Sequence, residues 1–150
     1  MHEKYMKIAI EEAKKSLDTD VPVGAVLVRN NKIIARGHNQ KEKKKNAIRH
    51  AEIIAIEKAC KKNHNWHLED CELYVTMEPC IMCTGAIIQS RIPKVYYGVK
   101  NDKFGISNHF KIEEKTKIDN HYIHFYGGYL KEEIETMLKT FFQKKRVNKR

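Results

Sequence analysis

Two short segments of this chain carry residue types that together can hold and use a zinc ion. His50 and Glu52 are separated by one residue, and Cys80 and Cys83 belong to a Pro-Cys-x-x-Cys run. Zinc prefers four nitrogen and sulfur ligands, and a catalytic zinc keeps one position open for water. One imidazole and two thiolates fill three positions, and a carboxylate beside the metal can act as general base and acid. The sequence therefore predicts His50, Cys80 and Cys83 as zinc ligands and Glu52 as the catalytic carboxylate.

The spacing within each segment indicates how the two helices must point. With about 3.6 residues per turn, Cys80 and Cys83 lie roughly 60° apart on one helix face, and Pro79 suits the helix start. His50 and Glu52 diverge by roughly 200° and cannot share a side face. Their helix must therefore direct its first turn at the metal. We expect two helix N-termini to converge on one ion, where the helix dipoles favour thiolates.

A lone Cys-x-x-Cys has other interpretations. It also occurs as a redox pair and as half of a structural zinc ribbon. A ribbon needs a second pair, which Cys60 and Cys71 do not form. A His-x-Glu followed by Pro-Cys-x-x-Cys is, in contrast, the signature of zinc nucleobase deaminases. A further alternative is a non-catalytic, zinc-stabilised RNA-binding module in which Glu52 is a residue favoured at a helix start.

The composition is that of a small globular enzyme. The chain has 150 residues, of which 41% are hydrophobic and 32% are charged. This length suits a single domain over residues 1–150. No run approaches the ~20 apolar residues of a membrane span, and the N-terminus has no signal-peptide pattern. Because two of the four cysteines are assigned to metal, we expect a reducing, cytoplasmic location.

The chain carries an excess of positive charge, with 29 Lys and Arg against 19 Asp and Glu and a net charge of +10. Such a balance favours polyanionic partners, because neutralised phosphates release counterions, although a solvated surface also explains it. Two clusters favour a polyanion: residues 41–45 (Lys-Glu-Lys-Lys-Lys), and the basic residues within 144–150, which follow Phe141 and Phe142. Aromatic side chains beside cations suit unstacked bases and phosphates, but the last helix can also use these phenylalanines in its core.

Helical and strand-like hydrophobic patterns alternate along the chain without repeats. This order implies parallel strands covered by helices, and a hairpin at residues 29–31 adds an antiparallel edge. We therefore expect an α/β fold with a five-stranded mixed sheet and an active site beyond the strand ends. The expected helices span residues 5–17, 50–60, 80–90 and 131–145, and the expected strands span 23–28, 33–35, 73–76, 94–99 and 122–126.

These blocks resemble tRNA-specific adenosine deaminases, bacterial enzymes that convert the wobble adenosine of tRNA to inosine. The resemblance runs from the first helix to the phenylalanine pair and is sharpest at residues 21–28, 50–53 and 74–80. It implies a three-layer cytidine deaminase-like fold, one Zn²⁺ per subunit, a homodimer in which a neighbour's loop helps to shape each site, and the tRNA anticodon stem-loop as substrate. The implied reaction is hydrolytic deamination, in which zinc-bound hydroxide attacks C6 of adenine and Glu52 shuttles the protons.

The resemblance also implies a set of substrate contacts. Asn39 would hydrogen-bond the flipped adenine, the Val23 side chain would form a wall of the base pocket, and the Ala51 backbone N–H would contact the base. Phe141 and Phe142 correspond to an aromatic pair near the anticodon loop.

The chain departs from the family pattern at three places. Residues 46–49 read Asn-Ala-Ile-Arg where the family often has Asp-Pro-Thr-Ala. Asn101 occupies a position close to the RNA backbone that is usually Asp, and the loss of this charge is expected to relax selection between RNA and single-stranded DNA. Residues 105–109 differ from the family's small-residue loop.

A deaminase of a free nucleobase or nucleoside (guanine, cytosine or cytidine) shares the zinc core and is the main alternative.

Overall fold

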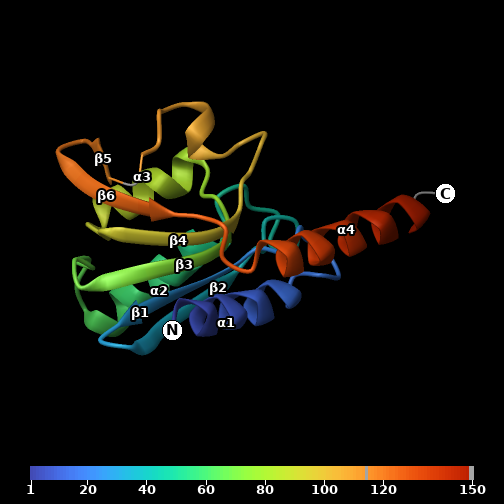
Figure 1. The fold of residues 1–150 in the computed structure, drawn as a ribbon. Coiled ribbons are helices and arrows are strands. Elements are labelled where there is room, and N and C mark those ends of the chain that lie inside the picture. Colours follow the sequence, from blue (N-terminus) through green and yellow to red (C-terminus); the bar gives the residue numbers. More distant parts are fainter. Residues whose placement is uncertain (114, 149–150) are drawn as a thin grey trace.

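The fold is built around one mixed β-sheet, seen in the computed structural model, which describes residues 1–113 and 115–148 (Figure 1). The sheet has six strands in the order β2-β1-β3-β4-β6-β5. The strands are β1 (Gly24–Arg29), β2 (Lys32–His38), β3 (Cys71–Met77), β4 (Lys94–Val99), β5 (Lys115–Ile118) and β6 (His121–Tyr126). The helices are α1 (His2–Lys14), α2 (Ala51–Asn63), α3 (Ile81–Gln89) and α4 (Lys131–Asn148), with a short 3-10 helix, η1 (Ile106–Asn108).

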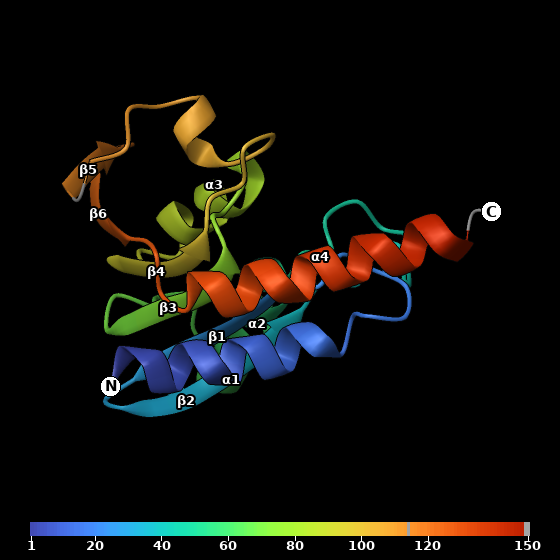
Figure 2. The ribbon, with the colours of Figure 1, turned by 45° about the vertical axis from the view of Figure 1, so that its right-hand side comes forward.

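The centre of the sheet is parallel and its two edges are antiparallel hairpins. β3 pairs with β4 and β4 with β6 in parallel, while β1 runs antiparallel to both β2 and β3. Helices α2 and α3 cover one face of the sheet, and α1 and α4 cover the other (Figures 1 and 2). This arrangement confirms the predicted three-layer α/β fold. No described helix has the length and hydropathy of a membrane-spanning segment.

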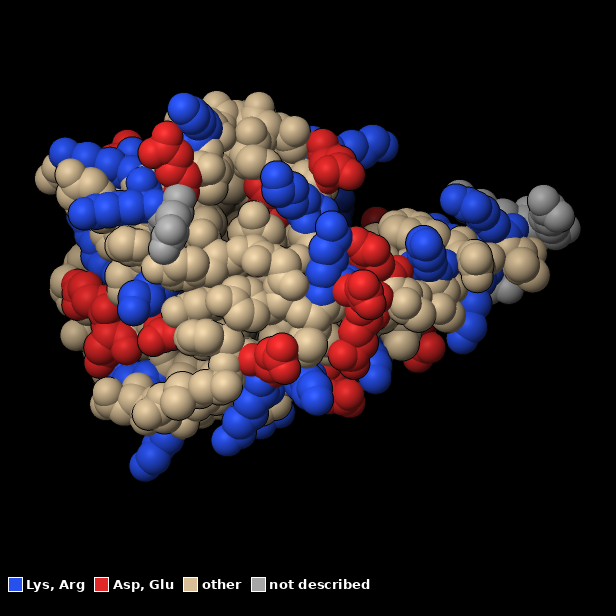
Figure 3. All heavy atoms as spheres, viewed as in Figure 1, with Lys and Arg blue, Asp and Glu red and all other residues tan. Residues whose placement is uncertain are grey.

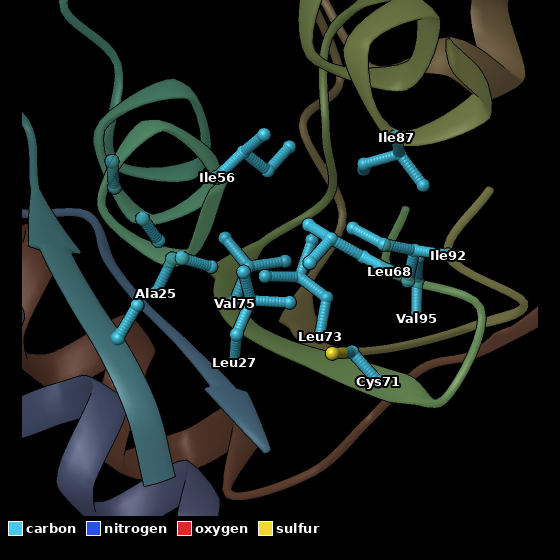
Figure 4. Packing of buried hydrophobic residues seen from close by; sticks show 14 of the residues in the cluster. Ala25, Leu27, Ile56, Leu68, Cys71, Leu73, Val75, Ile87, Ile92 and Val95 are labelled. Atoms are coloured by element: carbon cyan, nitrogen blue, oxygen red, sulfur yellow. The ribbon is translucent and has the colours of Figure 1, made fainter. Parts of the chain in front are cut away.

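Side-chain alternation along β1 divides the interior into two cores. Ala25 and Leu27 join the cluster under α2 and α3, whereas Val26 and Val28 join the cluster under α1 and α4. Successive residues of a strand point to opposite faces, so a strand buried on both faces reads as a continuous apolar run. Figure 4 shows the first core, with residues of β1 and β3 facing Ile56 of α2.

The structure adds a sixth strand to the five that the sequence predicts. β5 reads Lys-Thr-Lys-Ile and pairs antiparallel with β6 through a turn at Asp119 and Asn120, which have φ values of 48° and 62°. Two consecutive positive φ angles are typical of a tight hairpin turn. Lysine is common on edge strands because it discourages further pairing, and it also hides the apolar pattern. The first helix ends at Lys14, so the predicted extension to Leu17 was wrong.

Close approach of helix α1 to the sheet depends on Gly24 at the start of β1. A Cβ at this position would lie 1.9 Å from the carbonyl oxygen of Ala9 and 2.5 Å from the backbone nitrogen of Ala13. Both atoms belong to the backbone of α1, so they cannot move away without displacing the helix. Gly24 therefore sets the distance between α1 and the sheet.

Replacing Gly24 by alanine is expected to lower the free energy of unfolding by about 3 kcal/mol, because the added methyl group overpacks a rigid contact. Urea denaturation of the variant and the parent protein measures this change. Gly85→Ala is the matched control, since a Cβ at Gly85 meets no atom within 4 Å. Equal stability of Gly24→Ala and the parent protein would show that the helix does not need this close approach.

Candidate active site

The predicted metal ligands lie at the starts of two helices. His50 is the N-cap residue of α2 and Cys80 is the N-cap residue of α3, both with extended backbone angles. Cys83 lies in the first turn of α3 and is fully buried. Helix α3 follows strand β3, so the cysteines stand beyond the carboxyl end of the central strands. The structure thus brings two helix N-termini to one point, as the residue spacing predicts.

The three ligand atoms are spaced as a tetrahedral zinc ion requires. His50 Nδ1 lies 3.7 Å from Cys80 Sγ and 3.5 Å from Cys83 Sγ. All three ligand atoms lie within 4.8 Å of one another. With Zn–N and Zn–S lengths of about 2.1 and 2.3 Å, a tetrahedral zinc holds its nitrogen and sulfur ligands about 3.6 Å apart. The residues therefore fit a zinc ion that has three protein ligands and one open position.

The protonation behaviour of the two thiols also suits a cation. The pKa of Cys80 is lowered to about 4, chiefly by a hydrogen bond with Cys83 and in smaller part by the nearby His50. The hydrogen bond with Cys80 raises the pKa of Cys83, and burial raises it further. Hydrogen bonding to Cys80 also raises the pKa of His50. Two sulfurs this close resist ionising together, so a pair of thiolates needs a metal charge between them.

Glu52 is a buried carboxylate in the first turn of α2, two residues after the ligand His50. Only 4% of the surface of Glu52 is exposed. The pKa of Glu52 is raised to about 7, chiefly by burial and in smaller part by the neighbouring Cys80 sulfur. A carboxyl group with this pKa can both accept and donate a proton near neutral pH, which is the requirement for general acid–base catalysis.

Asn39 is held in a fixed orientation at the end of β2. Its side-chain Nδ2 donates to the carbonyl oxygen of Val21 at 3.1 Å, and its Oδ1 accepts from the backbone N–H of Lys41 at 3.1 Å. The side chain of Ser16 also donates to the Asn39 carbonyl oxygen at 2.7 Å. A primary amide has two donors and two acceptor lone pairs, so one of each stays free for a ligand.

The other residues expected to bind substrate lie at different depths. Val23 is half-buried and packs against the core under α2, while Ala51 is fully buried as the first residue of α2. The first N–H groups of a helix have no intrahelical partner, so the Ala51 N–H is available as a donor. Asn101 Oδ1 accepts the backbone N–H of Phe104 at 3.0 Å, which uses this side chain to shape its own turn.

Phe141 and Phe142 lie on a different helix from the metal ligands. Both belong to α4, which covers the face of the sheet opposite to α2 and α3 (Figures 1 and 2). Phe141 is buried and Phe142 is exposed, with their rings edge to face and the centroids 5.2 Å apart. Both views place the outer half of α4 at the end of the sheet where residues 39–50 run.

Two buried carboxylates at this end of the sheet were not identified from the sequence. Asp20 accepts the backbone N–H groups of Glu42 and Lys43, at 2.6 and 3.2 Å. Glu78, directly before the Pro-Cys pair, accepts N–H groups from the segment that follows β4. A buried acid has no sequence signature unless its partner is also a side chain with a recognisable spacing. Apart from the adjacent Thr19 hydroxyl, which donates to Asp20 at 3.2 Å, the partners here are backbone groups of distant loops.

Comparisons with known proteins agree with this geometry. Residues 1–99 match the family model of the cytidine and deoxycytidylate deaminase zinc-binding region. A tRNA-specific adenosine deaminase of Bacillus subtilis (strain 168) is 45% identical over 149 residues, covering 99% of this chain and 92% of the relative.

Solved structures show the same fold. A structure from studies of A-to-I editing by tRNA:A34 deaminases at the wobble position of transfer RNA has a TM-score of 0.75 and 35% identity, over 83% of this chain and 97% of that chain. The guanine deaminase of Bacillus subtilis has a TM-score of 0.67 and 34% identity, over 98% and 94% of the two chains. The near-full-length relative and the zinc-binding region confirm the resemblance seen in the sequence: this chain belongs to the family of tRNA-specific adenosine deaminases.

Proposed function

We propose that this protein deaminates adenosine to inosine at the wobble position of tRNA anticodons, with one Zn²⁺ per subunit held by His50, Cys80 and Cys83. The observation that carries the proposal is the meeting of these three ligand atoms with a buried carboxylate at the starts of α2 and α3. The tRNA-specific relative of Bacillus subtilis supports adenosine in tRNA as the substrate.

The chemistry divides between the metal and Glu52. When bound, zinc lowers the pKa of water in its open position and so supplies a nucleophile at neutral pH. Glu52 is buried, and its pKa of about 7 suits a group that takes a proton from water and delivers it to N1 of adenine. Once the water oxygen has added to C6, the Glu52 carboxylate takes the proton of the new C6 hydroxyl and passes it to the amino group. The C6–N bond then breaks, ammonia leaves as a neutral molecule, and the C6 carbonyl of inosine remains.

The adenine is bound and oriented by three groups around the metal. Asn39 offers one free N–H and one free lone pair, and its fixed orientation lowers the entropy cost of binding. The side chain of Val23 forms an apolar wall, and the Ala51 N–H donates from the start of α2. An adenine must leave the anticodon stack to reach these groups, which costs least in a flexible loop.

The RNA is bound by basic residues outside the base pocket. The lysine turn (Lys41, Lys43, Lys44 and Lys45) is exposed, and the buried carboxylate of Asp20 holds its backbone in place. The outer half of α4 adds a second basic surface, where Figure 3 shows Lys and Arg side chains around the projecting helix. Lys149 and Arg150, part of the predicted C-terminal cluster, lie outside the described residues. RNA phosphates are the natural partners of both surfaces.

The active form that we propose is a homodimer. Ile48 precedes the ligand His50 by two residues, Ile81 follows the ligand Cys80, and both isoleucine side chains are more than half exposed. Exposed apolar patches mark interfaces with other molecules, and a dimer interface here would cover these two side chains. A second copy that covers both isoleucines would bring its own loops to the mouth of the site.

Deamination of a free nucleobase is the second candidate function. It is favoured by the likeness to the guanine deaminase of Bacillus subtilis, which covers nearly the whole chain. The two functions share the metal and Glu52, so only the substrate distinguishes them. A free base would be bound with little dependence on salt, whereas RNA binding weakens as counterions compete.

Metal analysis of purified variants separates the role of a ligand from that of the proton shuttle. Cys83→Ser is expected to lose zinc, because it removes one of three protein ligands. Glu52→Ala is expected to keep one zinc per chain while kcat falls by about 10²–10⁴-fold, the usual contribution of general acid–base catalysis. Stoichiometric zinc in Cys83→Ser, or metal loss in Glu52→Ala, would contradict these assignments.

Replacing the four lysines of the lysine turn by glutamine is expected to weaken binding of an anticodon stem-loop and to reduce the salt dependence of that binding. The slope of the logarithm of the association constant against the logarithm of the salt concentration should become less negative by about 0.7 for each phosphate that the variant no longer neutralises. Fluorescence anisotropy over a series of salt concentrations measures this slope. The matched control replaces four lysines far from the metal ligands by glutamine: Lys32, Lys94, Lys115 and Lys117. Equal slopes for the two quadruple variants would show that the lysine turn does not contact RNA.

Incubation with total small RNA tests the proposed function most simply. Sequencing should reveal adenosine read as guanosine at the wobble position, because inosine pairs as guanosine does, and Glu52→Ala should leave the RNA unchanged. Ammonia released from guanine, cytosine or a nucleoside, with no altered base in the RNA, would replace tRNA editing by the second candidate function.

A further inference from the structure

Glu78 is a buried carboxylate whose partners are both backbone N–H groups. It is 4% exposed. Oε1 accepts the N–H of Asn101 at 3.2 Å and Oε2 accepts the N–H of Ser107 at 2.8 Å. None of the ion pairs among the described residues includes Glu78. Both hydrogen bonds reach one segment, residues 101–107, which we call the 101–107 loop.

Gly105 allows the loop to approach this carboxylate. A Cβ at Gly105 would lie 2.5 Å from Glu78 Oε1 and 2.6 Å from the carbonyl oxygen of Asn101. The backbone angles of Gly105 (φ −63°, ψ 149°) are accessible to any residue. Space, and not backbone conformation, therefore requires glycine here. Glu78 thus supplies the hydrogen bonds to the loop, and Gly105 leaves the space that the Glu78 carboxylate occupies.

The same loop runs directly beside the segment that carries the ligand Cys80. A single antiparallel bridge pairs the backbones of Cys80 and Gly105, and the N–H of Ile106 donates to the carbonyl oxygen of Pro79 at 2.9 Å. The loop also exposes Phe104, with 64% of its surface accessible. An exposed aromatic ring on a held loop suits the stacking of an unpaired base.

We propose that Glu78 is a positioning residue that fixes the 101–107 loop as part of the RNA-binding surface at the mouth of the site. The inference rests on the proposed function. Its physical basis is that a loop held in advance loses less entropy when RNA binds. The metal ligands have a support of their own in the helix that follows Cys80. The first turn of α3 sets them, with the N–H of Thr84 donating to the carbonyl oxygen of Cys80 at 2.9 Å.

Glu78→Gln keeps the shape of the side chain but removes one acceptor, because the new NH₂ group faces a backbone N–H. The zinc content is expected to stay at one per chain, and kcat to stay within about threefold. KM and the Kd for an anticodon stem-loop should rise by about tenfold, the effect of losing one hydrogen bond to a charged group. The amides of Asn101 and Ser107 should exchange hydrogen faster than in the parent protein.

Gly105→Ala breaks the same interaction from the loop side and serves as the second variant. It should reproduce the rise in KM and the faster amide exchange. The KM of the double variant should be no higher than that of the poorer single variant, because both changes disrupt the same interaction. Matched controls are Gly85→Ala, whose Cβ meets open space, and Glu69→Gln, whose side chain is 60% exposed. Both are expected to behave as the parent protein does.

Three results would overturn the inference. Loss of zinc in Glu78→Gln would make Glu78 a support of the metal site. A lower kcat with an unchanged KM would place its effect on the chemical step. Faster exchange at Asn101 and Ser107 with an unchanged Kd for RNA would show that Glu78 holds the loop but that the loop does not bind RNA. Failure of the proposed function is distinguishable, because the parent protein itself would then leave the stem-loop unaltered.

Discussion

The candidate site depends on the meeting of two helix N-termini, those of α2 and α3, beyond the carboxyl end of the central strands. Because His50 and Cys80 are N-cap residues, their side chains leave the helices along the axes and reach one point. The positive ends of both helices also favour negative charge there, which suits thiolates. The residue two positions after His50 then turns into the protein, where burial gives Glu52 its raised pKa.

Loops that surround this point are fastened by buried carboxylates. Asp20 holds the lysine turn, and Glu78 holds the 101–107 loop. In each case the two oxygens accept backbone N–H groups, which stabilises the loop without a regular strand or helix. Irregular segments near the site are thus held by hydrogen bonds to side chains.

Local residue spacing was enough to predict which side chains meet at the starts of α2 and α3. The positions of His50, Cys80 and Cys83 follow from helical geometry and from the preference of zinc for nitrogen and sulfur. The resemblance to tRNA-specific adenosine deaminases supplied the substrate, and the relatives confirm the family. The roles of Glu78 and Asp20 were not predictable, because their partners are main-chain groups 22 to 29 residues away with no side-chain pattern. Strand β5 was not predicted because two of its four residues are lysines on an edge strand, which gives it no apolar pattern.

The central claim is that one imidazole and two sulfurs hold a single zinc ion with one position left for water. X-ray absorption at the zinc edge of the purified protein measures this coordination directly. The expected spectrum contains two sulfur ligands at about 2.3 Å and two nitrogen or oxygen ligands at about 2.0–2.1 Å. A spectrum with four sulfur ligands, or with nitrogen and oxygen ligands alone, would contradict the account.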